Sequence, residues 1–259
     1  YLRNRTVLYY RIANDPKMVH RAFDGTGKTY AMPRSGAYFP TEIVEPSTLL
    51  HEARLRKAPE EVELMQRAAT ISAEAHCRAM AATKPGMHEY EIEAVLLEHF
   101  RKNGSERVAY GCIVGSGPNA TILHYRANDR KMNEGELLLI DAGCEYGYYA
   151  SDITRTFPVS GTFTKPQAEV YELVLEAQLA GIELAKVGSN IDAVHQCCVQ
   201  KLTAGMVKLG ILQGDVEALI AEEKYKPFYM HRSSHWLGMD VHDAGAYYVE
   251  GKSRPLEAG

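Results

Sequence analysis

Two aspartates lie in the part of the chain that has the strongest strand character. Asp141 follows four apolar residues, 137–140, and Asp152 comes eleven residues later, beyond a turn centred near 146–147. Counted outward from Tyr146, a hairpin would place the two aspartates nearly opposite each other, with ~4.5–5.5 Å between their Cα atoms. Two facing carboxylates repel unless a proton or a cation lies between them. The spacing therefore predicts either a two-metal site bridged by acids, or a turn cap at Asp141 with Asp152 paired to Arg155.

A second group of residues with metal-binding or catalytic chemistry contains His231, His235 and His242. Their pattern is not that of a zinc-protease helix, because no glutamate follows His231. Gly238 and the loop-like flanks also disfavour a helix that would carry His231 and His235 one turn apart. His124, which follows an apolar stretch, is a weaker signal still. Taken alone, all four are more typical of hydrogen-bonded structural histidines than of ligands.

The elements that must position these residues are helices alternating with hairpins. Apolar residues at helical spacing predict a helix from Pro59 to about residue 82, and a second one that ends near Gly104. Thr164 and Gln167 have the spacing of a capping box. Further helices are expected over 170–184, 191–209 and 215–223, and strands over 7–10, 110–114, 120–125, 136–145 and 148–157. Alternation of helices with hairpins favours an α+β fold over a doubly wound sheet.

Composition excludes several classes of function. The 259 residues carry a net charge of −4 and 46% of them are apolar, so a general nucleic-acid binder with a basic footprint is disfavoured. The longest strongly apolar stretch, residues 137–140, is far short of the ~20 residues that cross a bilayer. Five cysteines without C-x-x-C spacing and no leader segment favour reduced thiols in a cytoplasmic protein. We expect neither a nucleic-acid nor a membrane partner.

Taken together, these segments resemble a known family. The string around Asp141, continued through Asp152, is similar to the metal-binding hairpin of the pita-bread metallopeptidases, family M24, and within them to bacterial aminopeptidase P, the Xaa-Pro aminopeptidase. The likeness covers the chain from about Leu55 to its end and is carried by the joint order and separation of several strings. They are residues 113–117, 122–125, 140–145, 151–158, 231–238 and 241–243.

The resemblance implies a role for each candidate residue. Asp141 would bind one metal ion, Asp152 would bridge two, and His235 would bind the other through an imidazole nitrogen. Tyr110 matches a tyrosine that steadies one of the aspartate ligands. The family uses two manganese ions, which agrees with the preference of carboxylate-rich sites for such ions. The catalytic and substrate-binding residues would be His242, which would hydrogen-bond around the scissile carbonyl, and His124 and His231, which would line the pocket for the proline.

The resemblance also implies the architecture. It predicts a pita-bread fold, in which an antiparallel sheet carries helices on its outer face. Residues 1–55 would be the end of a creatinase-like N-terminal domain with its linker, and residues 56–259 a catalytic domain truncated at its C-terminal end. The family completes its site with two glutamates, and Glu257 does not have a matching context. Arg232 replaces a small residue, so its guanidinium could narrow the substrate side or repel a free amino group.

The implied activity is hydrolysis of the N-terminal Xaa-Pro bond of peptides through a hydroxide activated by two metal ions. A homo-oligomer is also implied. One alternative is a prolidase, which cuts only Xaa-Pro dipeptides on the same fold. Another is a pita-bread binding module that has lost catalysis, in which case the intact protein would bind no metal. Creatinase-like enzymes lack the metal-binding acids, so Asp141 and Asp152 disfavour them.

Overall fold

The computed structural model describes residues 2–11, 15–30, 36, 38 and 40–259. The chain divides into two compact units, Tyr1–Leu55 and Arg56–Gly259. In the first unit, β1 (Val7–Tyr9) pairs in parallel with β2 (Glu42–Val44), and α1 (Pro16–Tyr30) and α2 (Ser47–Leu55) complete the described elements. The strand expected over 7–10 is present. Helix α1 has no counterpart among the sequence expectations, because Gly25 and Gly27 lie within it and glycine disfavours a helix.

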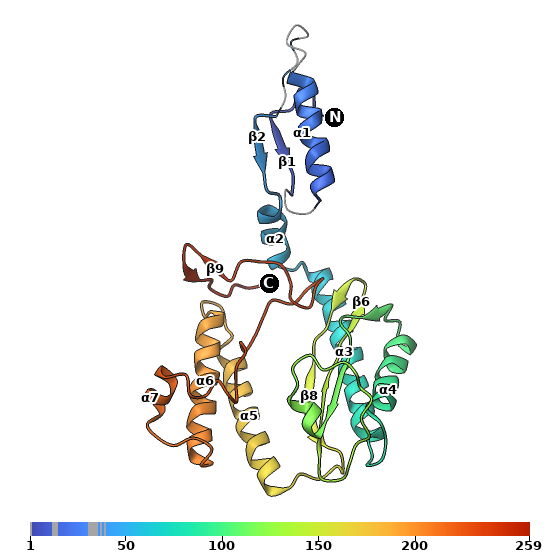
Figure 1. Cartoon of the computed structure of the whole chain (residues 1–259), viewed down its shortest axis with the longest axis vertical. Coiled ribbons are helices and arrows are strands. Elements are labelled where there is room, and N and C mark those ends of the chain that lie inside the picture. The colour runs from blue at the N-terminus through green and yellow to red at the C-terminus, as the bar shows by residue number, and fades with distance from the viewer. Residues whose placement is uncertain (1, 12–14, 31–35, 37, 39) are drawn as a thin grey trace. The chain divides into compact units, whose positions relative to one another are not determined.

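The second unit begins with two helices that pack against each other, α3 (Pro59–Ala82) and α4 (Glu89–Lys102). Helix α3 begins where the sequence predicts, with a proline in its first turn followed by two glutamates that interact favourably with the helix dipole. Gly104 adopts a φ of 91° just beyond α4, which is the expected glycine stop. Figure 1 shows both helices beside the strands that follow them.

These strands form two small antiparallel sheets. One has the order β4-β5-β8 and the other the order β3-β6-β7. Helices α3 and α4 pack on them, and the core between helices and sheet includes Ile71, Ile92, Leu96, Phe100, Val114, Leu138 and Ile140. The expected α+β pita-bread fold, with helices outside an antiparallel sheet, is confirmed. The strands are β3 (Arg107–Val108), β4 (Ile113–Ser116), β5 (Leu137–Asp141), β6 (Cys144–Tyr146), β7 (Tyr149–Ala150) and β8 (Thr154–Pro158).

The strand expected over 120–125 is wrong. Residues Gly117–Thr121 form a 3₁₀-helix, η2, and the segment after it contains no strand. His124 has a φ of 55°, which is outside the range of extended backbone. The expected strands over 136–145 and 148–157 are each divided in two, since the ladder is interrupted at residues 142–143 and 151–153.

The register of the aspartate hairpin also differs from the expectation. Gly147 and Tyr148 both have positive φ, of 55° and 71°, and join β6 to β7 as the two central residues of a tight turn. Such a turn matches the twist of a hairpin. It centres the hairpin one residue later than expected, so Asp141 faces Thr154 rather than Asp152.

A helix pair follows the sheet. Helices α5 (Lys165–Leu184) and α6 (Ile191–Lys208) pack side by side (Figure 1), and α7 (Val216–Ala221) packs on α6. The capping box is present, because the Thr164 N–H donates to the Gln167 side chain at 2.9 Å. The last hairpin consists of β9 (Tyr248–Val249) and β10 (Lys252–Ser253).

Two further observations bear on the expected class. All five cysteines are free thiols. Over the described ranges, none of the helices has both the length and the apolar character that crossing a bilayer demands.

Candidate metal centre

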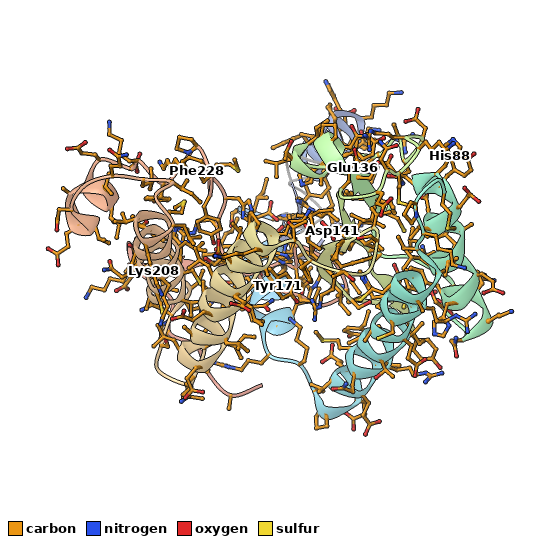
Figure 2. All side chains as sticks on the ribbon, turned by 90° about the horizontal axis from the view of Figure 1, so that it is seen from below. His88, Glu136, Asp141, Tyr171, Lys208 and Phe228 are labelled. Atoms are coloured by element: carbon orange, nitrogen blue, oxygen red, sulfur yellow. The ribbon has the colours of Figure 1, made fainter. Side chains whose placement is uncertain are left out.

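Two carboxylates and one phenol form the centre of the site. Asp141 is the last residue of β5 and Asp152 lies between β7 and β8. Tyr110, in the segment between β3 and β4, brings its hydroxyl to 2.5 Å from Oδ1 of Asp141 and 2.7 Å from Oδ1 of Asp152. Figure 2 labels Asp141 and also Glu136, which precedes the other end of β5. The hydroxyl therefore joins the two carboxylates although they are not directly paired in the hairpin.

One imidazole completes this group. Nε2 of His235 lies 3.1 Å from Oδ2 of Asp152, while its Nδ1 lies 2.8 Å from the carbonyl oxygen of Trp236. A proton on Nδ1 that is donated to this carbonyl fixes the orientation of the ring and leaves Nε2 facing the carboxylate. The ring of His242 packs against that of His235, with centroids 4.3 Å apart and an angle of 58° between the planes.

The pKa values of the two carboxylates are shifted in opposite directions. Burial raises the pKa of Asp141, and the neighbouring charge of Asp152 acts in the same direction. The hydrogen bond from His235 lowers the pKa of Asp152 and raises that of His235. Burial, reinforced by both carboxylates, raises the pKa of the Tyr110 hydroxyl, so it remains a hydrogen-bond donor. Asp141 is thus a half-buried acid whose ionised form is disfavoured by burial and by the charge of Asp152, and a metal ion would stabilise that form.

Side chains of helix α3 hold the aspartate hairpin, the segment that carries Asp141 and Asp152, through hydrogen bonds. Nε2 of His76 lies 3.0 Å from the carbonyl oxygen of Ala142, directly after Asp141. The Ser72 hydroxyl accepts the Cys144 N–H at 2.9 Å and contacts the Ser151 hydroxyl at 2.8 Å, next to Asp152. These contacts are buried. They tie both aspartate-bearing segments to one face of α3.

The hairpin also contributes a residue that the expected register did not bring to the site. Thr154 faces Asp141 across the β5–β8 ladder, and its side chain acts to lower the pKa of the Asp141 carboxylate, against the larger effect of burial. The signal for it was the turn: centring the hairpin on Gly147 and Tyr148 would have aligned Thr154 with Asp141.

The other two candidate histidines are not part of this hydrogen-bonded group. His124 is exposed in the segment after η2, although its charge reaches Asp141 and favours ionisation of that acid. His231 is exposed and contacts the ring of Tyr229 edge-on, with centroids 5.1 Å apart. The Arg232 guanidinium forms an ion pair with Asp192 on α6, so its charge is balanced by a partner outside the aspartate hairpin.

The donor set has the chemistry of a site for a hard or borderline divalent ion. It offers carboxylate oxygens from Asp141 and Asp152 and one imidazole nitrogen from His235, the ligands that manganese and zinc accept. In the part of the chain that the structure describes, no three His, Cys, Asp or Glu side chains are grouped closely enough to count as a complete ligand set. The three side chains are therefore of the types that bind such a metal ion, but they form only part of a ligand set.

The fold and the carboxylate hairpin agree with a sequence comparison at the level of families. Residues 63–259 match the model of metallopeptidase family M24, and the chain belongs to that family.

Individual relatives carry more specific names. The chain is 50% identical over 219 residues to an Xaa-Pro aminopeptidase of Haemophilus influenzae, covering 85% of this chain and 51% of that protein. It is 48% identical over 220 residues to the Xaa-Pro aminopeptidase of Escherichia coli, covering 85% of this chain and 50% of that protein. The chain spans about half the length of the curated relatives it matches.

Solved structures give the same likeness in three dimensions. The aminopeptidase PepP of Pseudomonas aeruginosa superposes with a TM-score of 0.96 at 49% identity, covering 99% of this chain and 58% of that one. A zinc-substituted aminopeptidase P of Escherichia coli in complex with product superposes with a TM-score of 0.94 at 43% identity, covering 99% of this chain and 58% of that one.

Proposed function

We propose that the protein is a metal-dependent exopeptidase that hydrolyses the N-terminal Xaa-Pro bond of peptides. The observation that carries this proposal is the joined pair of carboxylates, Asp141 and Asp152, with the His235 imidazole at 3.1 Å from the second. The support from comparison is that relatives named Xaa-Pro aminopeptidase are about half identical to this chain over most of its length.

The metal-binding part of the proposal assigns Asp141, Asp152 and His235 as ligands of two divalent ions, with Asp152 bridging them. Such ions lower the pKa of water, so that a hydroxide nucleophile is available at neutral pH. We propose manganese because carboxylate oxygens dominate the donor set. Tyr110 would hold the two carboxylates at a fixed separation through its short hydrogen bonds.

The remaining candidate residues would act on the substrate. An Xaa-Pro bond is a tertiary amide without an N–H, so recognition depends on its carbonyl and on the proline ring. His242, whose ring packs at a tilt against that of His235, would donate a hydrogen bond to the oxyanion that develops on this carbonyl, an interaction of about 3–4 kcal/mol. His124 and His231 would contact the proline side of the substrate. Both are exposed and accessible to a ligand.

Two alternatives remain distinct from this proposal. A prolidase would cleave the dipeptide Ala-Pro and leave Ala-Pro-Ala largely intact. A binding module would carry neither activity nor metal. The short contacts of Tyr110 with two acids favour an enzyme over such a module, because like charges are held together there without an evident structural need.

The test is a comparison of variants in the full-length protein. We expect the wild-type protein to release alanine from Ala-Pro-Ala but not from Ala-Ala-Ala, and to contain about two metal equivalents by elemental analysis. Asp152→Asn should lose both metal and activity, because an amide neither carries the charge nor bridges two cations. Asp24→Asn makes the same chemical change at an exposed position of α1 and should alter neither. An Asp152→Asn protein with wild-type cleavage would overturn the assignment.

Three wider expectations belong to the same proposal. We propose that residues 1–55 are the end of an N-terminal creatinase-like domain, which agrees with the compact unit Tyr1–Leu55. A cytoplasmic location is supported by five free thiols. Assembly into a homo-oligomer rests on the family resemblance alone.

A further inference from the structure

The segment that carries His235 and His242 is a compact loop. We call residues 235–243 the histidine loop. Within it, the Asp243 N–H donates to the carbonyl oxygen of Trp236 at 3.0 Å, and the Gly238 N–H donates to that of Asp240 at 3.1 Å. The Ala150 N–H of β7 donates to the Gly238 carbonyl oxygen at 2.8 Å. One backbone hydrogen bond therefore links the loop to the aspartate hairpin.

A buried ion pair also holds the loop. Nζ of Lys57 lies 3.0 Å from Oδ2 of Asp243, and the two side chains are only 10% and 1% exposed. Buried charges of this kind are tolerated when they are paired, and removal of one partner disturbs the other. Gly238 packs so closely on the pair that a Cβ there would collide with the Asp243 carboxylate. The ion pair is thus a buried, closely packed part of the loop and not a surface contact.

The position of Lys57 links the two halves of the site. Lys57 lies two residues before the start of α3, the helix whose Ser72 and His76 support the carboxylate hairpin. Asp243 directly follows His242 in the chain. The aspartates and the histidines are therefore both fixed relative to one helix. The aspartates are held through its middle, and the histidines through Lys57, two residues before its start.

We propose that Lys57 and Asp243 are positioning residues, which hold the histidine loop so that His235 and His242 face Asp152. The expected effect on metal binding rests on the proposed function. The expected effect on the order of the histidine loop does not. Neither side chain contacts a reacting atom in this proposal. Their effect is transmitted through the loop backbone, and a displacement of the imidazole by about 1 Å is enough to impair a preorganised site.

The experiment compares four variants of the full-length protein with wild type by amide hydrogen exchange and by titration of the metal-free protein with Mn²⁺. Asp243→Asn and Lys57→Met each break the ion pair, and Lys57→Arg retains the charge. Glu136→Gln is the matched control, because it breaks the partly buried ion pair with Arg130 outside the histidine loop.

We expect Asp243→Asn and Lys57→Met to accelerate exchange of the amides in 236–243 at least tenfold and to weaken Mn²⁺ binding about tenfold. Lys57→Arg should remain within about threefold of wild type in both measurements. Glu136→Gln should lower the unfolding midpoint without changing exchange in the histidine loop or Mn²⁺ affinity. If Asp243→Asn fails to fold, Lys57→Met and Lys57→Arg carry the comparison.

The inference is overturned if the variants that break the pair lower only the unfolding midpoint, as Glu136→Gln does, with wild-type exchange in 236–243. A wild-type protein that binds no Mn²⁺ would instead refute the proposed function. In that case the exchange data would still decide whether Lys57 and Asp243 hold the loop.

Discussion

At the scale of single residues, Tyr110 is the contact that makes the carboxylate pair a unit. Its hydroxyl lies within 2.7 Å of an oxygen of both Asp141 and Asp152. A phenol has one proton, so it shares that proton between the two acids or donates it to one at a time. Removal of the hydroxyl would leave both carboxylates without this hydrogen bond and free to separate.

We therefore expect Tyr110→Phe to weaken Mn²⁺ binding about 10- to 100-fold, the range found when the partner of a metal ligand is lost. Isothermal titration calorimetry of the metal-free protein with Mn²⁺ measures this change in affinity. Tyr148→Phe removes a hydroxyl from an exposed tyrosine in the hairpin turn and should bind Mn²⁺ like wild type. Equal affinities for Tyr110→Phe and Tyr148→Phe would mean that the phenol does not support the ligands.

At the scale of elements, the hairpin depends on a close approach at Gly143. Gly143 lies between β5 and β6, and a Cβ on it would collide with the carbonyl oxygen of Ser151, which lies between β7 and β8. Any side chain at this position must push apart the two segments that carry Asp141 and Asp152.

Gly143→Ala should accordingly destabilise the second unit by about 2–3 kcal/mol, the cost of overpacking a buried contact, and weaken Mn²⁺ binding. Urea unfolding followed by circular dichroism, together with a metal titration, gives both quantities. Gly27→Ala is the comparison, because the added methyl group meets no described atom within 4 Å beyond its chain neighbours and the backbone of its own helix. Unchanged stability in Gly143→Ala would show that the two segments can separate at no cost.

Elements with strong periodic signals could be predicted from the sequence. The bounds of α3 agree with the expectation because Pro59 and the following glutamates mark its start. The strand expected over 120–125 was wrong, because apolar residues at 122 and 123 are exposed there rather than buried in a sheet. The register error came from the turn, where Tyr148 adopts a positive φ that its residue type rarely takes.

The candidate site was predictable in part for a similar reason. Asp141 and Asp152 lie in one hairpin, so counting along the chain brings them close together. The proximity of His235 to Asp152 spans 83 residues, and no local pattern encodes it; only the family resemblance joined these residues. The pair of Lys57 and Asp243 spans 186 residues and carries no motif, so it emerges from the structure alone.

At the scale of the whole molecule, the pH dependence of stability includes a clear contribution from Glu136. Arg130 binds this carboxylate and lowers its pKa from 4.5 to about 2. Because the folded pKa lies below the unfolded one, the stabilisation is fully present above about pH 4.5 and is lost as the pH falls toward 2. Glu136 is about one-fifth exposed, so solvent screening reduces the contribution to an estimated 1–3 kcal/mol.

Glu136→Gln should therefore be about 1–3 kcal/mol less stable than wild type at pH 6, with the difference shrinking to near zero at pH 2. Urea unfolding of both proteins at several pH values between 2 and 6 measures the difference directly. A gap that stays constant over this range would mean that the Glu136 carboxylate is not preferentially ionised in the folded state.

We propose above all that Asp141 and Asp152, the acids of the hairpin, hold divalent ions. The most direct measurement is anomalous diffraction from a crystal of the full-length protein grown with excess Mn²⁺. We expect strong anomalous peaks between Asp141 and Asp152, with one of them beside Nε2 of His235. Absence of any peak there, with the carboxylates still bonded to Tyr110 and His235, would contradict it.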